Sequence, residues 1–454
     1  MRKPIISICI TNFNYSKYIE KSIVSALDQS FNKKDYEIII IDDGSSDNSR
    51  NIIKKYLNNQ NIRTVFNKKN KGLVKSINIG IKASKGEYFL RLDADDKLNR
   101  NALTNLYNVI NKDNEIGIVY SDFYIIDEFD HIIKREKKIN LNESKINIMD
   151  TAPHGACSLI RKNFLIENGM YDENFDRQDG YDLWYKFFKK YKIRNVNKPL
   201  FFYRKHQKSL SSNLFKLLET RSHIIRKVIK SKRKIKNYCL IPVRGKQFDK
   251  SCISNEILKK KTVLEWTIDT VLKTNNIDKI ILTSGDLNLL NRTKKKYKKK
   301  IIYHLRDEKY CYENTSYMNL IPKVIENKKI QDPDNIVILN IESPFRKSFY
   351  IDNAINNHIF NKADKTISVS ADTSGHFYKY GKNGLKLISN KSYEKFRTEK
   401  KYIFSENGGI EVINFEKLKK KTKLDKVSHI LLDKISSFTI KDEFDLKVAK
   451  KIDF

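Results

Sequence analysis

The sequence predicts an α/β protein made of two successive domains. Short apolar runs alternate with helix-like stretches from the first residues onward, a basic amphipathic segment interrupts this alternation after residue 213, and a second alternation follows it. Alternation of this kind is typical of α/β architecture. The 454 residues are enough for two domains that each bury a core of their own.

The first alternation covers residues 1–213 and predicts a mostly parallel sheet covered by helices. Strands are expected at residues 5–10, 36–41, 64–66 and 87–92, and helices at residues 18–29, 46–57 and 74–83. Strands that alternate with helices in this order build strand–helix–strand units. In such sheets ligands bind beyond the carboxyl ends of the strands, so we look for a site in the residues that directly follow them.

Residues 214–237 are expected to form a basic amphipathic linker helix. Leucine, isoleucine and valine recur on one side of it, and lysines and arginines surround the rest. Such a helix either rests on an anionic membrane surface or packs between the domains, and the sequence leaves both interpretations open.

The second alternation covers residues 238–454. Strands are expected at residues 238–243, 279–282, 336–339 and 366–370, with a helix at residues 262–273. The lysine-rich run at residues 294–300 is expected to be a solvated helix face, because no nucleic-acid-binding signature accompanies it. The fold class predicted for the chain is therefore two nucleotide-binding (Rossmann-like) α/β domains in series.

The composition favours anionic small-molecule partners. Lys and Arg number 89 against 54 Asp and Glu, for a formal net charge of +35, and hydrophobic residues make up 40%. The apolar fraction excludes a disordered chain, while the charge suits nucleotide-sugars or acidic lipid surfaces. Nucleic acid is not an expected partner, because the net charge is the only feature of the sequence that would favour it.

Cysteine usage and the N-terminus both predict a cytoplasmic protein. The five cysteines are scattered without CxxC spacing, so neither a disulfide framework nor a zinc site is expected. The basic start and the apolar residues 4–10 imitate a leader peptide, but the apolar run stops at Thr11 without a cleavage site. A position on the inner face of the cell membrane depends on whether the basic helix binds lipid.

Two acidic clusters directly follow expected strands. Asp42-Asp43-Gly44-Ser45 follows residues 36–41, and Asp93-Ala94-Asp95-Asp96 follows residues 87–92. Closely spaced carboxylates at a strand end can hold a divalent cation that neutralises developing phosphate charge. A solvated acidic turn is the alternative interpretation for an isolated D-x-D.

The order of the surrounding segments decides between these alternatives. Five segments precede the second acidic cluster, at residues 7–15 (SICITNFNY), 40–47 (IIDDGSSD), 70–73 (NKGL), 78–81 (NIGI) and 85–88 (KGEY). Over about residues 4–212 this ordered set closely resembles family-2 glycosyltransferases of the GT-A fold. The resemblance implies a metal-dependent enzyme that takes a nucleotide-sugar donor, with Mn²⁺ or Mg²⁺ as cofactor.

The resemblance also implies roles at the nucleoside end of a donor site. Asp42 or Asp43 would contact the base and ribose of the donor, and a carboxylate can accept from the N–H of a uracil ring. Asn12 and Tyr15 follow the first strand and would line the nucleotide pocket. Gly44 would allow a turn or a close backbone approach.

At the phosphate end, the resemblance implies that Asp95, helped by Asp93, holds the cation; Asp93 would thereby also border the donor. The closing segment at residues 203–211 contributes Arg204, which suits a bidentate phosphate contact. His206 in the same segment would supply a cation or phosphate contact, with a solvated loop as the alternative.

Residues 175–184 resemble the segment of these enzymes that bears the catalytic base. Asp179 is the candidate base, since an acceptor hydroxyl that attacks an anomeric carbon gains from losing its proton to a carboxylate. The usual acidic pair reads Asp179-Gly180 here, so the acid falls one residue early. Asp182 is expected to cap or anchor the helix that follows.

The second half resembles cytidylyltransferases that make CMP-activated acidic sugars, over roughly residues 238–454. The loop after its first strand would wrap a nucleotide triphosphate, with Arg244 matching the pattern and Lys246 and Lys250 compensating in charge for lost residues. The expected metal-binding aspartates fall at Thr439 and Lys441, which cannot replace them. We therefore expect a degenerate domain that binds a nucleotide, a partner or an acceptor.

The function predicted is transfer of a sugar, from a UDP-sugar, to a surface-glycan or lipid-linked acceptor with inversion. The first alternative is a bifunctional enzyme whose second domain also makes a CMP-sugar from CTP. The second is a non-catalytic nucleotide-binding scaffold. The linkage and the sugar moved are open.

Overall fold

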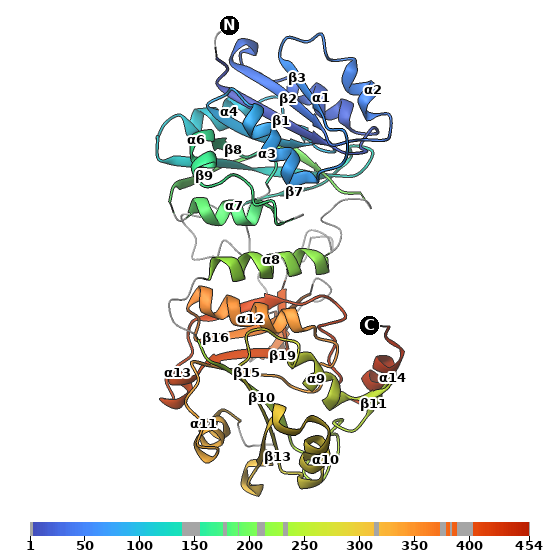
Figure 1. Cartoon of the computed structure of the whole chain (residues 1–454), viewed down its shortest axis with the longest axis vertical. Coiled ribbons are helices and arrows are strands. Elements are labelled where there is room, and N and C mark those ends of the chain that lie inside the picture. The colour runs from blue at the N-terminus through green and yellow to red at the C-terminus, as the bar shows by residue number, and fades with distance from the viewer. Residues whose placement is uncertain are drawn as a thin grey trace. The chain divides into compact units, whose positions relative to one another are not determined.

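The computed structural model describes residues 3–138, 155–175, 179–188, 190–206, 214–229, 235–312, 317–372, 378–381, 384–387 and 403–453. The chain divides into two compact units, Met1–Arg221 and Ser222–Phe454 (Figure 1). Each unit has its own sheet and is described by itself. None of the described helices is long and apolar enough to cross a membrane.

The first unit is built on a mixed sheet of nine strands. Its path is β3 (Ile62–Phe66), β2 (Tyr36–Asp42), β1 (Ile6–Asn12), β4 (Tyr88–Asp93), β8 (Leu159–Arg161), β6 (Ile116–Ile126), β9 (Lys192–Arg204) and β5 (Lys97–Leu98), and β7 (Ile132–Glu136) pairs with β6. The first four strands of this path are parallel, as predicted, whereas β8 runs antiparallel to both of its neighbours. The expectation of a mostly parallel sheet is therefore confirmed for the N-terminal strands; beyond them β6 and β9 are parallel to each other, and the other printed pairings are antiparallel.

The helices of the first unit follow the expected rhythm. They are α1 (Ile19–Leu27), η1 (Lys33–Asp35), α2 (Ser49–Lys54), α3 (Leu73–Ala83), α4 (Ala102–Ile110), α6 (Lys162–Glu167) and α7 (Asp179–Phe188). Every residue of β1 and β2 is buried, because helices cover both faces of a parallel sheet. Helix α3 approaches β1 closely at Gly80, where a Cβ atom would lie 2.2 Å from the sulfur of Cys9.

Strand register brings the carboxyl ends of β1, β2, β3 and β4 to one edge of the sheet. Asn12 pairs with Asp42, Asp42 with Phe66, and Thr11 with Asp93. Both predicted acidic clusters therefore begin at the same edge, although about fifty residues of chain separate them. We call this edge the carboxyl edge of the first sheet.

The second unit has a seven-stranded mixed sheet. Its order is β14 (Ile302–Leu305), β13 (Lys279–Ser284), β10 (Asn237–Val243), β15 (Asn335–Ile338), β19 (Ile403–Asn414), β16 (Lys365–Asp372) and β20 (Val427–Leu431). Two short hairpins, β11 (Ile257–Leu258) with β12 (Lys261–Thr262) and β17 (Tyr378–Gly381) with β18 (Gly384–Leu387), lie outside it. All four strands expected from sequence belong to the large sheet.

The helices of the second unit are α9 (Val263–Val271), α10 (Leu287–Tyr297), η3 (Lys298–Lys300), η4 (Glu308–Tyr310), α11 (Tyr317–Asn327), α12 (Ser348–Asn361), α13 (Phe415–Lys419) and α14 (Glu443–Lys451). Helix α9 begins with a capping box, in which Thr262 accepts from the backbone N–H of Glu265 and the Glu265 carboxylate accepts in return. The lysine run at residues 294–300 lies at the end of α10 and in η3, and most of its side chains are exposed, as predicted.

The expected linker helix is α8 (Leu214–Val228), shorter at its C-terminal end than the predicted residues 214–237. The boundary between the two compact units falls inside it, after Arg221. Ile224 and Ile225 of α8 are buried, so these two side chains are not open to a lipid surface in this structure.

Candidate nucleotide-sugar site

Asp42 is fully enclosed at the carboxyl edge of the first sheet. Its Oδ1 accepts from the side-chain amide of Asn12 at 3.0 Å, and its Oδ2 accepts from the backbone N–H of Ser45 at 3.2 Å and from Nε of Arg50 at 2.7 Å. The Asp42 side chain has no exposed surface. This carboxylate therefore fixes the loop that follows β2 and the position of Asn12.

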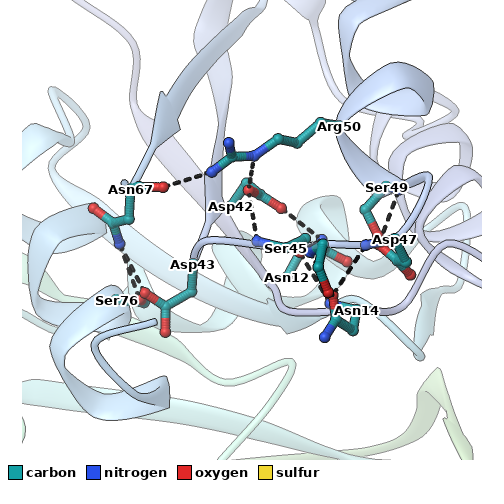
Figure 2. A network of polar contacts seen from close by, with 11 residues as sticks. Asn12, Asn14, Asp42, Asp43, Ser45, Asp47, Ser49, Arg50, Asn67 and Ser76 are labelled. Atoms are coloured by element: carbon teal, nitrogen blue, oxygen red, sulfur yellow. Dashed lines mark hydrogen bonds and ion pairs between the residues drawn. The ribbon is translucent and has the colours of Figure 1, made fainter. Parts of the chain in front are cut away.

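Asp43 points to the other side of the same loop (Figure 2). Its Oδ1 accepts from the Asn67 side chain and from the backbone N–H of Lys71, both at 2.9 Å, and its Oδ2 accepts from the N–H of Gly72 at 2.8 Å. Asp43 thus ties the end of β2 to the loop before α3. The tie requires Gly44, whose φ is +78° and whose Cβ would lie 2.6 Å from the backbone of Lys69.

Arg50 and Asn67 belong to this network although the sequence analysis did not name them. Arg50 donates to Asp42 and, at 2.5 Å, to the backbone carbonyl of Asn67, and its guanidinium lies 5.8 Å from the centre of the Phe66 ring. Figure 2 shows Arg50 reaching from α2 to both residues. A signal was available, because a buried aspartate pair directly after an apolar strand requires donors nearby.

Asp93 is held by Arg91, two residues earlier on β4. Nε of Arg91 lies 2.7 Å from Oδ1 of Asp93, and Nη2 lies 3.1 Å from Oδ2. The sequence predicted Asp93 as a cation ligand, whereas here both of its carboxylate oxygens already accept from a guanidinium. Arg91 was missed, although an arginine inside a buried apolar strand requires a partner of opposite charge.

Asp95 instead meets His206. Nε2 of His206 lies 3.0 Å from Oδ2 of Asp95, across 111 residues of sequence. The histidine ring stacks on Tyr18 at 5.4 Å and meets Tyr15 edge to face at 5.6 Å. Burial and the neighbouring carboxylate of Asp95 raise the pKa of the Tyr15 hydroxyl. The structure therefore brings together three residues predicted for the donor site, Tyr15, Asp95 and His206.

Negative charge accumulates beneath this group. Asp96 is buried, its Oδ1 accepts from the backbone N–H of Arg204 at 2.9 Å, and its Oδ2 has no hydrogen-bond partner among the described residues. Burial, followed by the charges of Asp95 and Asp93, raises the pKa of Asp96 well above its ordinary value. A cation beside Asp95 would relieve this excess of negative charge.

Arg204 has a different position from the predicted phosphate contact. Its side chain has no exposed surface, and it donates to the backbone carbonyls of Asp95 and Asp127, both at 2.8 Å, and to Oδ1 of Asp130 at 2.5 Å. The guanidinium also lies 4.8 Å from the centre of the Tyr18 ring. Arg204 therefore holds the Asp95 turn through its backbone carbonyl, and its enclosed guanidinium is not exposed to a donor phosphate.

Helix α7 begins at the candidate base, Asp179. The side chain of Asp179 lies outside the described part of the chain, so the structure gives only its backbone position. The next residue, Gly180, packs on Gly155, where a Cβ would lie 3.8 Å from the Gly180 Cα and 3.4 Å from Nη1 of Arg91. The start of α7 is thus close to the arginine that holds Asp93. Asp182 lies inside α7, buried, with Lys186 at 2.6 Å one turn later, so it anchors the helix and does not cap it.

The residues at the carboxyl edge fit an octahedral cation such as Mn²⁺ or Mg²⁺ in a specific way. The described residues contain no group of three or more His, Cys, Asp or Glu that could hold a metal ion by itself. Mg²⁺, however, is commonly bound by one or two carboxylates with substrate phosphates and water completing the shell. Asp95 and His206 would supply the protein ligands, and the buried Asp96, whose Oδ2 has no hydrogen-bond partner among the described residues, follows Asp95 directly.

The predicted nucleotide residues of the second unit do not converge. Arg244 lines a cavity after β10, with Nη1 3.9 Å from Oδ2 of Asp249. Lys246 is exposed and lies 3.4 Å from Glu256, and Lys250 is exposed on the same loop. Neither lysine lines the cavity. Thr439, at one expected metal position, donates from its hydroxyl to the carbonyl of Asn407 at 3.1 Å.

Comparison with known proteins identifies the first unit. Residues 7–175 match the model for glycosyl transferase family 2. An uncharacterized glycosyltransferase of Rickettsia typhi is 35% identical over 191 residues, which cover 40% of this chain and 58% of that protein. The cholesterol galactosyltransferase of Borreliella burgdorferi is 32% identical over 230 residues, or 46% of this chain and 62% of that protein.

A third relative and one solved structure are also similar to part of this chain. The poly(ribitol-phosphate) beta-N-acetylglucosaminyltransferase TarP of Staphylococcus aureus is 33% identical over 174 residues, 37% of this chain and 50% of that protein. The structure of S. aureus TarS 1-349 with UDP-GlcNAc covers 50% of this chain and 68% of that chain, at 20% identity and a TM-score of 0.42. This chain thus spans about three fifths or less of the length of these curated relatives. The N-terminal unit carries a glycosyl transferase family 2 domain.

Proposed function

We propose that the family 2 domain in the first unit is a catalytic glycosyltransferase, which moves a sugar from a nucleoside diphosphate donor, a UDP-sugar, to a glycan or lipid-linked acceptor with inversion. The observation that carries the proposal is the pairing of Asp95 with His206 at the edge where Asp42 and Asp43 also lie. The match of residues 7–175 to the family supports it.

The nucleoside end of the donor would lie against the network at Asp42 and Asp43. Asn12, Asp43 and Asn67 offer amide and carboxylate groups, which can read the polar edge of a uracil ring. Because Asp42 already accepts three hydrogen bonds and is fully enclosed, its part is to hold the pocket in shape. Tyr15 would line the space between this end and Asp95.

The diphosphate end would lie at Asp95 and His206, which would hold Mn²⁺ or Mg²⁺ together with the donor's phosphate oxygens. The cation would neutralise the charge that develops on the leaving diphosphate. Two residues keep Asp95 in place. Asp93 is fixed by Arg91 and accepts from the backbone N–H of Asp96, which closes the turn around Asp95. Arg204 donates to the backbone carbonyl of Asp95.

The displacement itself needs a base on the acceptor side. In the proposed step an acceptor oxygen forms a bond to the anomeric carbon, its proton passes to the carboxylate of Asp179, and the bond from the anomeric carbon to the diphosphate oxygen breaks. The position of Asp179 at the start of α7 supports this assignment, because the next residue, Gly180, packs on Gly155, which in turn lies near Arg91.

The acceptor is proposed by class only. One matched relative is named for cholesterol and another for poly(ribitol-phosphate), so the family domain serves lipid and polymer acceptors in different proteins. The same two classes are proposed for this chain. Association with an anionic membrane surface through α8 stays a prediction, and so does a cytoplasmic location.

The direct test is metal-dependent turnover of a panel of nucleotide-sugars by the full chain. We expect Asp95→Ala to lower turnover roughly a hundredfold or more, because an electrostatic contact to the leaving group is lost. Asp113→Asn is the matched control: it removes an exposed carboxylate that precedes β6, at the opposite edge of the sheet, and should leave the rate unchanged. An Asp95→Ala protein that turns over every donor at the rate of the unchanged chain would disprove the proposal.

For the second unit we propose nucleotide or ligand binding without nucleotidyl transfer. The support is that Thr439 and Lys441 are not carboxylates and that Lys246 and Lys250 are not among the residues that line the cavity at Arg244. Incubation of the full chain with CTP, Mg²⁺ and acidic sugars should release no pyrophosphate above background. Release of pyrophosphate with formation of a CMP-sugar would favour the bifunctional alternative.

A further inference from the structure

A cavity of about 280 Å³ opens in the second unit at the carboxyl ends of its parallel strands. Its wall is formed where β10, β14 and β15 end, together with the start of α11. This is the edge at which α/β sheets bind ligands. The volume corresponds to roughly nine water molecules, at about 30 Å³ each, so it suits a small metabolite.

Arg306 is the unusual residue of this cavity. It is only 6% exposed, yet its described hydrogen-bond partners are two backbone carbonyls, those of Thr283 at 3.1 Å and Tyr310 at 3.4 Å, and its Nε has none. Burial and the nearby guanidinium of Arg244 lower the pKa of Arg306. A buried guanidinium without a carboxylate partner is costly, so its natural complement is an anion that arrives with a ligand.

The remaining polar groups of the wall do not supply that anion. Asp249 lies beside Arg244, at 3.9 Å from its Nη1. Burial raises the pKa of Glu342, which favours the neutral acid that can donate a hydrogen bond. Val243, Leu320 and Ile341 supply apolar side chains to the same cavity.

The cavity wall is braced from behind, as a binding site requires. Asn340 donates from its side chain to the carbonyl of Gly408 at 3.0 Å, and the buried Arg346 donates to the carbonyls of Asn340 and Gly409. Arg346 also donates to the hydroxyl of Thr267 at 3.2 Å. These hydrogen bonds therefore hold the segment that carries Ile341 and Glu342 in place, so that a ligand is not needed to order it.

We propose that this cavity binds a small molecule through a single oxyanion group, a phosphate or a carboxylate, held between Arg306 and Arg244. The body of the ligand lies against the apolar wall. The exposed Lys246 and Lys250 are not part of the site. The proposal rests on the ligand binding proposed for the second unit and is independent of sugar transfer by the first unit, so oxyanion binding and sugar transfer can each fail without the other.

The test follows alkylation of Cys252, which lines the cavity and is 8% exposed, by mass spectrometry of the full chain without added metal. Inorganic phosphate, acetate and chloride are compared at equal ionic strength, with Cys9 in the core of the first unit as internal reference. We expect phosphate, acetate or both to slow alkylation of Cys252 and chloride to have no effect. Protection by phosphate alone assigns a phosphate ligand, and protection by acetate alone a carboxylate ligand.

Variants separate this site from general attraction to a basic chain. Arg306→Gln should raise the half-protecting anion concentration roughly tenfold or more, since a charge-assisted hydrogen bond is lost. Arg244→Gln, at a partly exposed position, should do the same and serves if Arg306→Gln fails to fold. Arg100→Gln removes an exposed charge from the first unit and should change nothing. Equal protection in the Arg244→Gln protein and the unchanged chain, or no protection by either oxyanion, would overturn the proposal.

Discussion

Arg91 and Asp93 form a bidentate ion pair on β4, with N···O distances of 2.7 and 3.1 Å. Both carboxylate oxygens of Asp93, the first aspartate of the D-x-D motif, therefore accept from Arg91. The second aspartate, Asp95, is the one that contacts His206. The third nitrogen of the guanidinium, Nη1, lies 3.4 Å from the position that a Cβ of Gly155 would take, and Gly155 packs on Gly180 near the start of α7. One arginine thus connects the first aspartate of the D-x-D motif with the segment that bears the proposed base.

Replacing Arg91 by lysine should lower turnover roughly tenfold while the protein stays folded. A lysine keeps the charge but cannot hold both oxygens of Asp93 in one plane. Arg91→Met should instead destabilise the first unit by about 3–5 kcal/mol, because it leaves Asp93 without its buried partner. Turnover and thermal unfolding of both variants check this, and adding Asp93→Asn to Arg91→Met should restore much of the stability. Stability unchanged in Arg91→Met would show that the pair has no structural part.

Gly44→Ala should destabilise the first unit more than Gly169→Ala does. Both glycines have positive φ, +78° and +79°, so an alanine is strained by a similar amount at either position, about 1 kcal/mol or more. Only Gly44 also faces a backbone, with Lys69 at 2.6 Å from the added Cβ, whereas Gly169 has no atom within 4 Å. Chemical denaturation of the two variants isolates the steric contribution. Equal losses would mean that the Asp42 and Asp43 loops are less tightly packed than described.

Asp130→Asn should weaken the first unit more at neutral pH than at pH 3. Burial acts to raise the pKa of Asp130, but hydrogen bonds from Lys21, Lys97 and Arg204 outweigh it and hold the pKa well below its ordinary value of 3.8. A carboxylate with a lowered folded pKa stabilises the protein fully above its unfolded pKa; this contribution declines as the pH falls below about 4 and is lost only when the pH passes the folded pKa. The difference in unfolding free energy between Asp130→Asn and the unchanged chain should therefore be smaller at pH 3 than at pH 7. A difference that does not shrink would contradict the charge pairing.

His358 should make the second unit sensitive to mild acid. Burial lowers the pKa of His358 from 6.5 to about 4, and its Nδ1 lies 3.1 Å from the Thr366 hydroxyl. Between these pH values the unfolded chain binds a proton that the folded chain does not, so stability falls as the pH drops from 6.5 to 4. His358→Gln should flatten that slope, while His131→Gln, at a histidine with 78% of its side chain exposed, should not. Denaturation followed through Trp266, in a Trp184→Phe background, reads the second unit. An identical slope in His358→Gln and the unchanged chain would refute the assignment.

The strand and helix pattern of both units could be read from the sequence. All eight strands expected there are present, because buried parallel strands are continuous apolar runs and the helices between them repeat with helical period. The mixed character of the sheets could not be read, since the short β8 and the long β6 and β9 pair with distant partners. Strand pairing of that kind depends on the whole core and not on local pattern.

The sequence by itself determined that Asp42, Asp43, Asp93 and Asp95 share one edge, because each follows a strand of the same parallel set. Only the tertiary structure decided how their charges are distributed. Asp42 pairs with Arg50, and Asp93 pairs with Arg91. Asp95 pairs with a histidine 111 residues away, while Arg204 donates to the backbone carbonyl of Asp95. The physical reason is that the end of a strand fixes the backbone position of the aspartate that follows it. Its partner is selected by burial, which forces every enclosed charge to find a donor from whichever segment the fold brings near.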